Sequence, residues 1–137
     1  YDYILIDSPP SLGLLTINAF TASDEVLIPL QAQYLALQGM SKLIEIIEKI
    51  QKRLNKKLKI GGVFITQYDN RKVLNRDVSD TIHKHFKNKI YLTPIRDNIA
   101  LAEAPSLGLD IFRYQPKSYG AEDYLRLCKE IIKTKKL

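Results

Sequence analysis

Tyr1-Asp2-Tyr3-Ile4-Leu5-Ile6-Asp7-Ser8-Pro9-Pro10 combines an apolar run, an acid at its end and two prolines. The run from Tyr3 to Ile6 is continuous, which is typical of a strand buried on both faces of a parallel sheet. In open parallel sheets, ligands bind beyond the carboxyl ends of the strands, which is where Asp7 stands. A carboxylate there can hold Mg²⁺ through water. Asp also caps turns after buried strands, so the residues alone leave both roles for Asp7 open.

The rest of the chain alternates between strand and helix patterns. The clearest helix runs from Leu37 to Leu54, where apolar residues recur at spacings of three and four. We expect strands at 3–6, 26–30, 60–66, 90–92 and 110–113, and helices at 11–22, 37–54, 75–87, 98–107 and 121–135. This order predicts an α/β fold with a mostly parallel sheet and flanking helices, as a single domain over residues 1–137. Pro29 is awkward in a central strand because it removes a ladder hydrogen bond.

Length and charge limit the kinds of protein this can be. The chain has 137 residues, enough for one domain with a buried core. It carries 21 Lys and Arg against 15 Asp and Glu, a formal charge of +6. This balance suits a polyanionic partner, and it equally suits a domain whose lysines serve only solubility. Charge alone therefore leaves a nucleic-acid partner as one of two alternatives.

Cysteine content and hydropathy point to a cytoplasmic protein. Cys128 is the only cysteine, which excludes an internal disulfide and Cys-based metal sites, and we expect it to be a buried small apolar residue. No apolar run reaches the ~20 residues that a membrane helix needs. The first residues show neither the basic region nor the cleavage site of a signal peptide.

Segments spread along the chain carry a more specific signal. Asp7-Ser8-Pro9-Pro10-Ser11-Leu12-Gly13 resembles the Walker B and switch II segment of the ParA/Soj-type partition ATPases. These are deviant-Walker P-loop NTPases, a group that also contains MinD and the nitrogenase iron protein. The resemblance continues, in the family's order, through residues 14–19, 28–31, 34–39, 62–69, 101–108 and 120–125. It implies a P-loop NTPase-like fold, and the family tolerates proline at the position of Pro29.

One part of the family pattern is missing from this sequence. The phosphate-binding P-loop lies upstream of the Walker B strand in the family, and no Gly-x-x-x-x-Gly-Lys-Ser/Thr occurs in this chain. We therefore expect a fragment, the C-terminal part of a ParA-like nucleotide-binding domain, with too little phosphate-binding machinery to hydrolyse ATP alone. Without the central P-loop strand, the fragment should be less stable than the intact protein or should dimerise.

The resemblance implies roles for individual residues. Asp7 would be the acid linked to Mg²⁺ through water, and Pro9, Pro10 and Gly13 would form the switch that senses the γ-phosphate of ATP. Two further segments would flank the adenine base, one after the strand at 60–66 and one before the helix at 98–107. Their nucleotide-binding residues are Thr66, Gln67 and Asp69 in the first, and Arg96, Asp97 and Asn98 in the second.

DNA is the partner that the basic residues suggest, since ParA-type proteins bind it without sequence preference as ATP-bound dimers. Phosphate contacts need only charge and reach, although a solvated helix face is the plain alternative. Ala100 stands where the family often has an arginine, and Arg96 would substitute for it. The candidate DNA-binding residues are Arg71, Lys72, Arg76, Lys84, Lys87 and Arg96, with Lys117, Lys129, Lys133, Lys135 and Lys136 adding charge.

The function that the resemblance implies is DNA segregation. An ATP-dependent homodimer would bind DNA on the nucleoid, and a ParB-like centromere-binding protein would stimulate hydrolysis and release. The alternative is a non-catalytic dimerisation or interaction module without ATPase activity. A MinD-like membrane-binding helix at 124–137, with Leu125, Leu127, Ile131 and Ile132 on one face, is a weaker alternative, because the matching family helix packs on the core.

Overall fold

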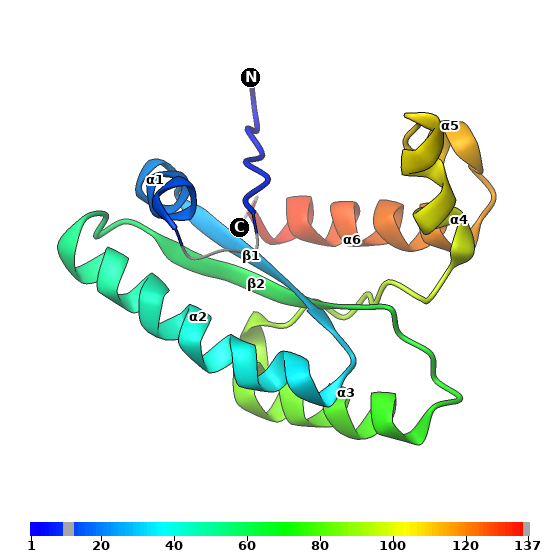
Figure 1. Ribbon diagram of the computed structural model, residues 1–137, viewed down its shortest axis with the longest axis horizontal. Coiled ribbons are helices and arrows are strands. Elements are labelled where there is room, and N and C mark those ends of the chain that lie inside the picture. The colour runs from blue at the N-terminus through cyan, green and yellow to red at the C-terminus, as the bar shows by residue number, and fades with distance from the viewer. Residues whose placement is uncertain (10–12, 136–137) are drawn as a thin grey trace.

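Two parallel strands form the centre of the fold (Figure 1). The computed structural model describes residues 1–9 and 13–135. In it, β1 (Glu25–Gln31) pairs with β2 (Lys59–Thr66), with Glu25 opposite Lys59 and Gln31 opposite Thr66. The connection between them is α2 (Tyr34–Arg53), as a parallel pair requires. The predicted α/β fold with a parallel sheet is confirmed.

Helices make up most of the remaining described chain. Their positions confirm four predicted helices to within a few residues, including α2, which begins three residues earlier than its apolar stripe. The helices other than α2 are α1 (Leu14–Ala22), α3 (Val73–Phe86), α4 (Ile99–Glu103), α5 (Ile111–Tyr114) and α6 (Tyr119–Lys135), with 3₁₀ turns η1 (Lys87–Lys89) and η2 (Ala104–Leu107).

The two faces of the sheet pack against different helices. Side chains alternate along a strand, so Val26, Ile28 and Leu30 of β1 face one side and are buried with apolar residues of α2 and α3. On the other face, Leu27 and Phe64 pack against a second cluster that includes Leu127 of α6. Figure 1 shows α2 and α3 on one side of the strands and α6 on the other. The sheet is therefore the middle layer of three.

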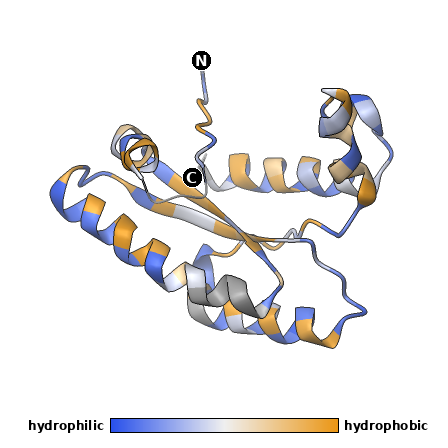
Figure 2. Cartoon of the chain, in the orientation of Figure 1, coloured by the Kyte–Doolittle hydropathy of each residue, from blue (hydrophilic) through white to orange (hydrophobic). Residues whose placement is uncertain are grey.

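Three predicted strands are absent from the described residues. Residues 1–9 form neither helix nor strand, so the strand predicted at 3–6 is wrong. Ile4 and Leu5 are 79% and 86% exposed, and this apolar segment projects away from the sheet (Figures 1 and 2). A strand buried on both faces needs neighbours, and the described part of this chain supplies none at that place.

The strand predicted at 110–113 is also wrong, because α5 occupies those residues. Asp110 caps this short helix, its Oδ1 accepting from the backbone N–H groups of Phe112 and Arg113 at 3.0 Å each. At 90–92, pairing is limited to one parallel bridge between Val63 and Ile90. The carboxylate of Glu130 accepts from the backbone N–H groups of Leu92 and Thr93, in place of a further strand.

Two sequence details acquire physical reasons. Among the described residues β1 pairs only with β2, so Pro29 stands on an edge strand, where a missing N–H is tolerated. Gly62 of β2 lies so close to the Tyr91 ring that a Cβ built on it would sit 2.3 Å from Cε2.

Cys128 is exposed on α6, which corrects its expected burial. In the ranges 1–9 and 13–135, no helix is both long and apolar enough to cross a membrane.

Candidate functional site

Backbone hydrogen bonds join the carboxyl end of β2 to the segment around Ile95. The Ile95 N–H donates to the Ile65 carbonyl at 2.8 Å, and the Tyr68 N–H donates to the Ile95 carbonyl at 3.0 Å. The Asp97 N–H then donates to the Tyr68 carbonyl at 3.0 Å. The two segments that sequence reasoning placed beside a nucleotide base, 66–69 and 96–98, therefore lie side by side.

A hollow of about 600 Å³ opens beside this junction. It brings together three of the six predicted nucleotide-binding residues, Asp69, Arg96 and Asp97, with side chains from α6. The rings of Tyr68 and Tyr119 and the guanidinium groups of Arg71 and Arg126 also line it. Aromatic rings next to fixed polar groups can orient a small ligand in such a hollow.

Asp69 is held by its neighbour Arg71. The backbone N–H and Nε of Arg71 donate to Oδ1 at 3.0 Å each, and Nη2 donates to Oδ2 at 2.9 Å. The side-chain hydrogen bond, followed by the backbone one, lowers the pKa of Asp69 to about 2. Asp69 is therefore an anion near neutral pH, paired with Arg71, whose own side chain is 87% exposed.

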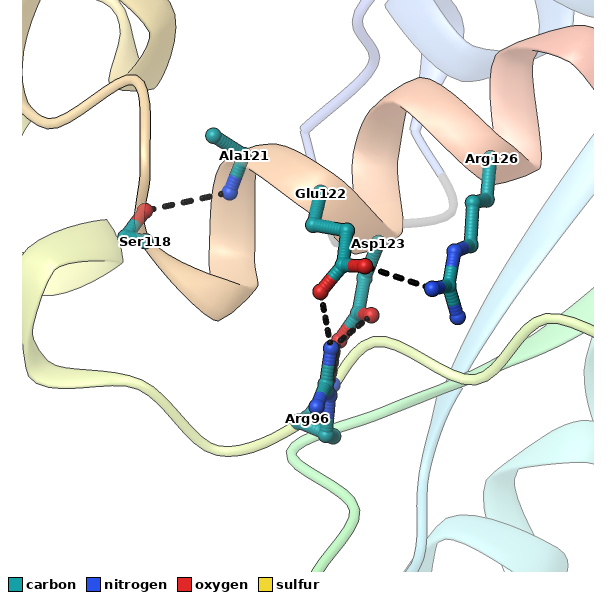
Figure 3. A network of polar contacts seen from close by, with 6 residues as sticks. All are labelled: Arg96, Ser118, Ala121, Glu122, Asp123 and Arg126. Atoms are coloured by element: carbon teal, nitrogen blue, oxygen red, sulfur yellow. Dashed lines mark hydrogen bonds and ion pairs between the residues drawn. The ribbon is translucent and has the colours of Figure 1, made fainter.

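Arg96 is held more firmly, by two carboxylates of α6 (Figure 3). Its Nε donates to Asp123 Oδ2 at 2.8 Å, and its Nη2 donates to Asp123 Oδ1 at 2.6 Å and to Glu122 Oε2 at 3.0 Å. The guanidinium also lies 4.2 Å from the centre of the Tyr119 ring, a cation–π contact. The hydrogen bond to Asp123 raises the pKa of Arg96 above its already high ordinary value.

Asp123 is the buried member of this network, with its side chain 4% exposed. Burial acts to raise the pKa of Asp123, but the side-chain and backbone hydrogen bonds from Arg96 outweigh it and hold that pKa below its ordinary value. The backbone bond runs from the Arg96 N–H to Oδ2 at 3.0 Å. One carboxylate thus fixes both the side chain and the main chain of Arg96.

Asn75 links the loops that follow the two strands. This side chain of α3 is buried, and its Nδ2 donates to the Ala32 carbonyl, just after β1, at 2.7 Å. Its Oδ1 accepts from the Asp69 N–H, after β2, at 2.9 Å. The carboxyl ends of β1 and β2 are therefore tied together by one amide group.

The other predicted nucleotide-binding residues lie around the junction. Thr66 is the last residue of β2, and Gln67 follows it with a positive φ of 50°, a conformation that non-glycine residues adopt infrequently. Asn98 is the N-cap of α4, and its Oδ1 accepts from the Ala100 N–H at 3.0 Å. Asn98 thus has a structural task in this state, whereas the exposed Gln67 presents its side chain to solvent.

The predicted metal and switch residues lie apart from the hollow. Asp7 and Pro9 belong to the exposed N-terminal segment, and Gly13 is the N-cap residue of α1. The Pro9 carbonyl accepts from the Thr16 hydroxyl at 3.4 Å, which ties the segment to α1. Pro10 lies outside the described residues. The assignment of Asp7, Pro9, Pro10 and Gly13 to the metal and the switch therefore stays a prediction.

Asp7 is the one residue that the sequence assigns to Mg²⁺. Mg²⁺ keeps several waters and is usually held by one or two carboxylates together with substrate phosphates. The described residues contain no group of three or more His, Cys, Asp or Glu that could hold a metal by themselves. A single exposed carboxylate such as Asp7 fits an ion whose other ligands are water and nucleotide.

Five of the six predicted DNA-binding residues lie on and around α3, the sixth, Arg96, lies before α4, and they differ in availability. Arg76, Lys84 and Lys87 are exposed. Arg71 is paired with Asp69, and Lys72 Nζ lies 4.0 Å from Asp97 Oδ2. Arg96 is engaged by Asp123 and Glu122, so reaching a DNA phosphate would require breaking that network.

The sequence-based predictions missed several residues of the site, among them Tyr68, Tyr119, Glu122 and Arg126, and two of the missed residues are buried, Asn75 and Asp123. Each has the same signal, a polar residue at an apolar position of an amphipathic helix. Asn75 stands three residues before Val78, and Asp123 stands four before Leu127, on the buried stripes of α3 and α6. A polar group on such a stripe needs a buried partner, and here the partners are the loops of the site.

The chain is similar to proteins of chromosome partitioning. A family model described as "AAA domain" matches residues 1–60. The chain is 53% identical to the sporulation initiation inhibitor protein Soj of Bacillus subtilis over 131 residues, which cover 96% of the chain and 52% of that protein. It is 43% identical to the chromosome partitioning protein ParA of Caulobacter vibrioides, covering 96% of the chain and 49% of that protein. The chain therefore spans about half the length of the curated relatives it matches.

Solved structures agree on the fold. The cell division ATPase MinD of Pyrococcus furiosus superposes with a TM-score of 0.76, covering 98% of this chain and 53% of MinD at 24% identity. A structure described as cobyrinic acid a,c-diamide synthase of Mycobacterium smegmatis, with bound ADP and magnesium, has a TM-score of 0.67 and 32% identity. It covers 86% of this chain and 41% of its own. The fold is that of P-loop NTPases.

Proposed function

Because the chain is a homologue of the chromosome-partitioning proteins Soj and ParA, we propose that it is the C-terminal part of a DNA-segregation ATPase. The observation that carries the proposal is identity of 43% to 53% over 96% of the chain. The intact protein would bind ATP and Mg²⁺, form a homodimer on DNA without sequence preference, and hydrolyse ATP slowly. A ParB-like centromere-binding protein would stimulate hydrolysis, and the protein would work in the cytoplasm on the nucleoid.

In this proposal, different residues of the chain serve the metal, the phosphates and the base. Asp7 would hold Mg²⁺ through water, and Pro9, Pro10 and Gly13 would respond to the γ-phosphate. The base would lie at the junction after β2, against the two segments that contain Thr66, Gln67 and Asp69, and Arg96, Asp97 and Asn98. Bound Mg²⁺ would neutralise phosphate charge, while this chain's residues would orient the nucleotide.

DNA would be bound by the exposed basic side chains around α3. Arg76, Lys84 and Lys87 are exposed, and they suit phosphate contacts, which need charge and reach. Arg71 and Lys72 would add less, since each already faces a carboxylate. Arg96 is the weakest candidate, because four hydrogen bonds hold it or its main chain to α6.

DNA binding by the full-length gene product tests the proposal. Binding to a duplex of random sequence would be measured with ATP, with ADP and for Asp7→Ala, over a salt series. We expect binding that needs ATP and Asp7 and that weakens steeply with salt, as counterion release requires. Binding that is absent, or indifferent to nucleotide, would overturn the proposal and favour an interaction module without ATPase activity.

A matched pair of variants tests the assignment of the DNA-binding face. Arg76→Glu and Lys56→Glu change the net charge equally, and both positions are exposed. Arg76 lies on α3 near the carboxyl end of β2, whereas Lys56 precedes β2 at the other end of the sheet. We expect Arg76→Glu to weaken binding and to lower the salt slope by about 1, with Lys56→Glu close to wild type.

A further inference from the structure

Two carboxylates of α6 accept hydrogen bonds from the segment 92–96, which runs beside β2. Glu130 accepts from the backbone N–H groups of Leu92 and Thr93, at 2.6 Å and 3.1 Å. Asp123, two turns earlier on the same face, accepts from the Arg96 N–H at 3.0 Å. These contacts take the place of the hydrogen bonds that a further strand would supply.

The two carboxylates differ in what else they hold. Glu130 accepts from backbone N–H groups, which is all that capping the main chain requires. Asp123 also grips the Arg96 guanidinium through both oxygens, at 2.8 Å and 2.6 Å (Figure 3). Such a two-pronged bond fixes direction as well as distance. Arg96 therefore has its main chain, its side chain and its ring contact with Tyr119 all defined from α6.

The energy of this pair does not explain its presence. Burying a carboxylate is costly, and apolar residues of the same volume often serve stability as well or better. The pair fixes the geometry of Arg96, which directly follows Ile95, the last residue of this segment with a backbone hydrogen bond to β2. The next residue, Asp97, is bonded to Tyr68, and Asn98 begins α4. Any rotation at Arg96 would move both.

We infer that Asp123 is a positioning residue, which sets the second base-side segment, 96–98, at the angle that the base of the nucleotide requires. The inference rests on the proposed function, because it assumes that a base lies at this junction. Asp123 acts through Arg96, which occupies both of its carboxylate oxygens. Glu122 shares Arg96 but leaves the main chain alone, and so contributes less.

The test measures base selectivity rather than affinity alone. Dissociation constants for fluorescent ADP and GDP analogues would be measured on the full-length protein, for wild type, Asp123→Asn and Glu130→Gln. We expect Asp123→Asn to lower the preference for adenine by about three- to tenfold, the effect of losing one net hydrogen bond at the base. Glu130→Gln alters the same kind of contact outside 96–98, and we expect it to leave the preference unchanged.

A merely structural role would not give this pattern, since partial unfolding weakens binding of both nucleotides by the same factor. Circular dichroism melts would confirm that each variant is folded at the assay temperature. If Asp123→Asn does not fold, Arg96→Lys replaces it. Lysine keeps the charge and the backbone contact but cannot make the two-pronged bond. We expect Arg96→Lys to lower the adenine preference as well.

The outcomes separate the two proposals. Wild-type protein that binds neither nucleotide would overturn the proposed function, and this inference with it. Wild-type binding without preference between the bases, an unchanged preference in folded Asp123→Asn, or an equal loss in Glu130→Gln would overturn the inference alone. A loss confined to Asp123→Asn and Arg96→Lys would support it.

Discussion

The N-terminal segment and the α6 junction are opposites in how their chemistry is satisfied. Residues 3–6 are apolar and exposed, with the sequence of a strand buried on both faces. At the junction, the charged side chains of Arg96 and Asp123 are matched within the chain. Exposed apolar surface and charges paired within the chain thus occur in one fold. The charged groups of the junction find their partners within this chain, whereas the apolar N-terminal segment has no packing neighbour among the described residues.

Truncating one leucine in each region should give the largest contrast. Leu127→Ala removes a buried side chain from under the sheet, and we expect it to lower the free energy of unfolding by about 2–5 kcal/mol. Leu5→Ala acts on an exposed side chain, and its expected effect is within about 0.5 kcal/mol. Urea denaturation of both variants gives the comparison.

A large effect of Leu5→Ala would contradict the exposed state of the N-terminal segment. If that effect grew with protein concentration, a second copy of the chain would be covering the segment, as the sequence-based expectation of dimerisation allows. If it did not, the segment would be packing on its own chain.

Substituting Asn75, which links the loops after β1 and β2, should change the free energy of unfolding less than Leu127→Ala does. Asn75→Ala leaves the Ala32 carbonyl and the Asp69 N–H without their partner, and we expect a loss of about 1–3 kcal/mol in unfolding free energy. Asn70→Ala, at an exposed position of the same loop, is the control and should change stability little. Equal effects of the two substitutions would show that the link between the strand ends is not formed in solution.

The sequence predicts the parts of this fold that follow from periodicity. The apolar stripes of α2 and α3 and the runs of β1 and β2 place those elements within a few residues of their observed bounds. The same reasoning fails at 110–113, where two apolar residues between charged ones are equally compatible with a strand. There the local cap from Asp110 decides for helix. It fails at 3–6 because a segment with a strand pattern forms a strand only when another strand lies beside it.

The candidate site also has a part that could be predicted from the sequence and a part that could not. The proximity of segments 66–69 and 96–98 could be predicted from the resemblance to the ParA/Soj-type ATPases, which implies that both flank the base. The partners of Arg96 could not, since Glu122 and Asp123 lie 26 and 27 residues away and reach it only after α6 has packed. Long-range polar pairing depends on the finished fold, so a single sequence gives only a hint, the polar residue on an apolar stripe.

Acid should weaken the junction through Asp123. Its pKa is lower in the folded protein than the ordinary value of about 3.9, so the stability it contributes is complete above that pH. That contribution is lost as the pH falls from there through the folded-state pKa. Asp123→Asn should therefore be less stable at pH 7 and should show a shallower fall in unfolding free energy below about pH 4. Urea denaturation between pH 7 and 3 measures both, and an unchanged acid slope would remove Asp123 from the pairing.

The pair of Asp69 and the exposed Arg71 should show the smallest effect, in titration rather than in stability. Arg71→Gln removes the guanidinium that holds the Asp69 pKa at about 2, so the carboxyl should titrate closer to about 3.9. Surface ion pairs contribute little to stability, so the melting temperature should stay the same. NMR titration of the Asp69 carboxyl carbon provides the measurement, with Arg126→Gln, which leaves the Asp69 contacts intact, as control. An Asp69 pKa that stays near 2 in Arg71→Gln would mean that the loop's backbone, rather than Arg71, holds this anion, and that Arg71 is available to DNA after all.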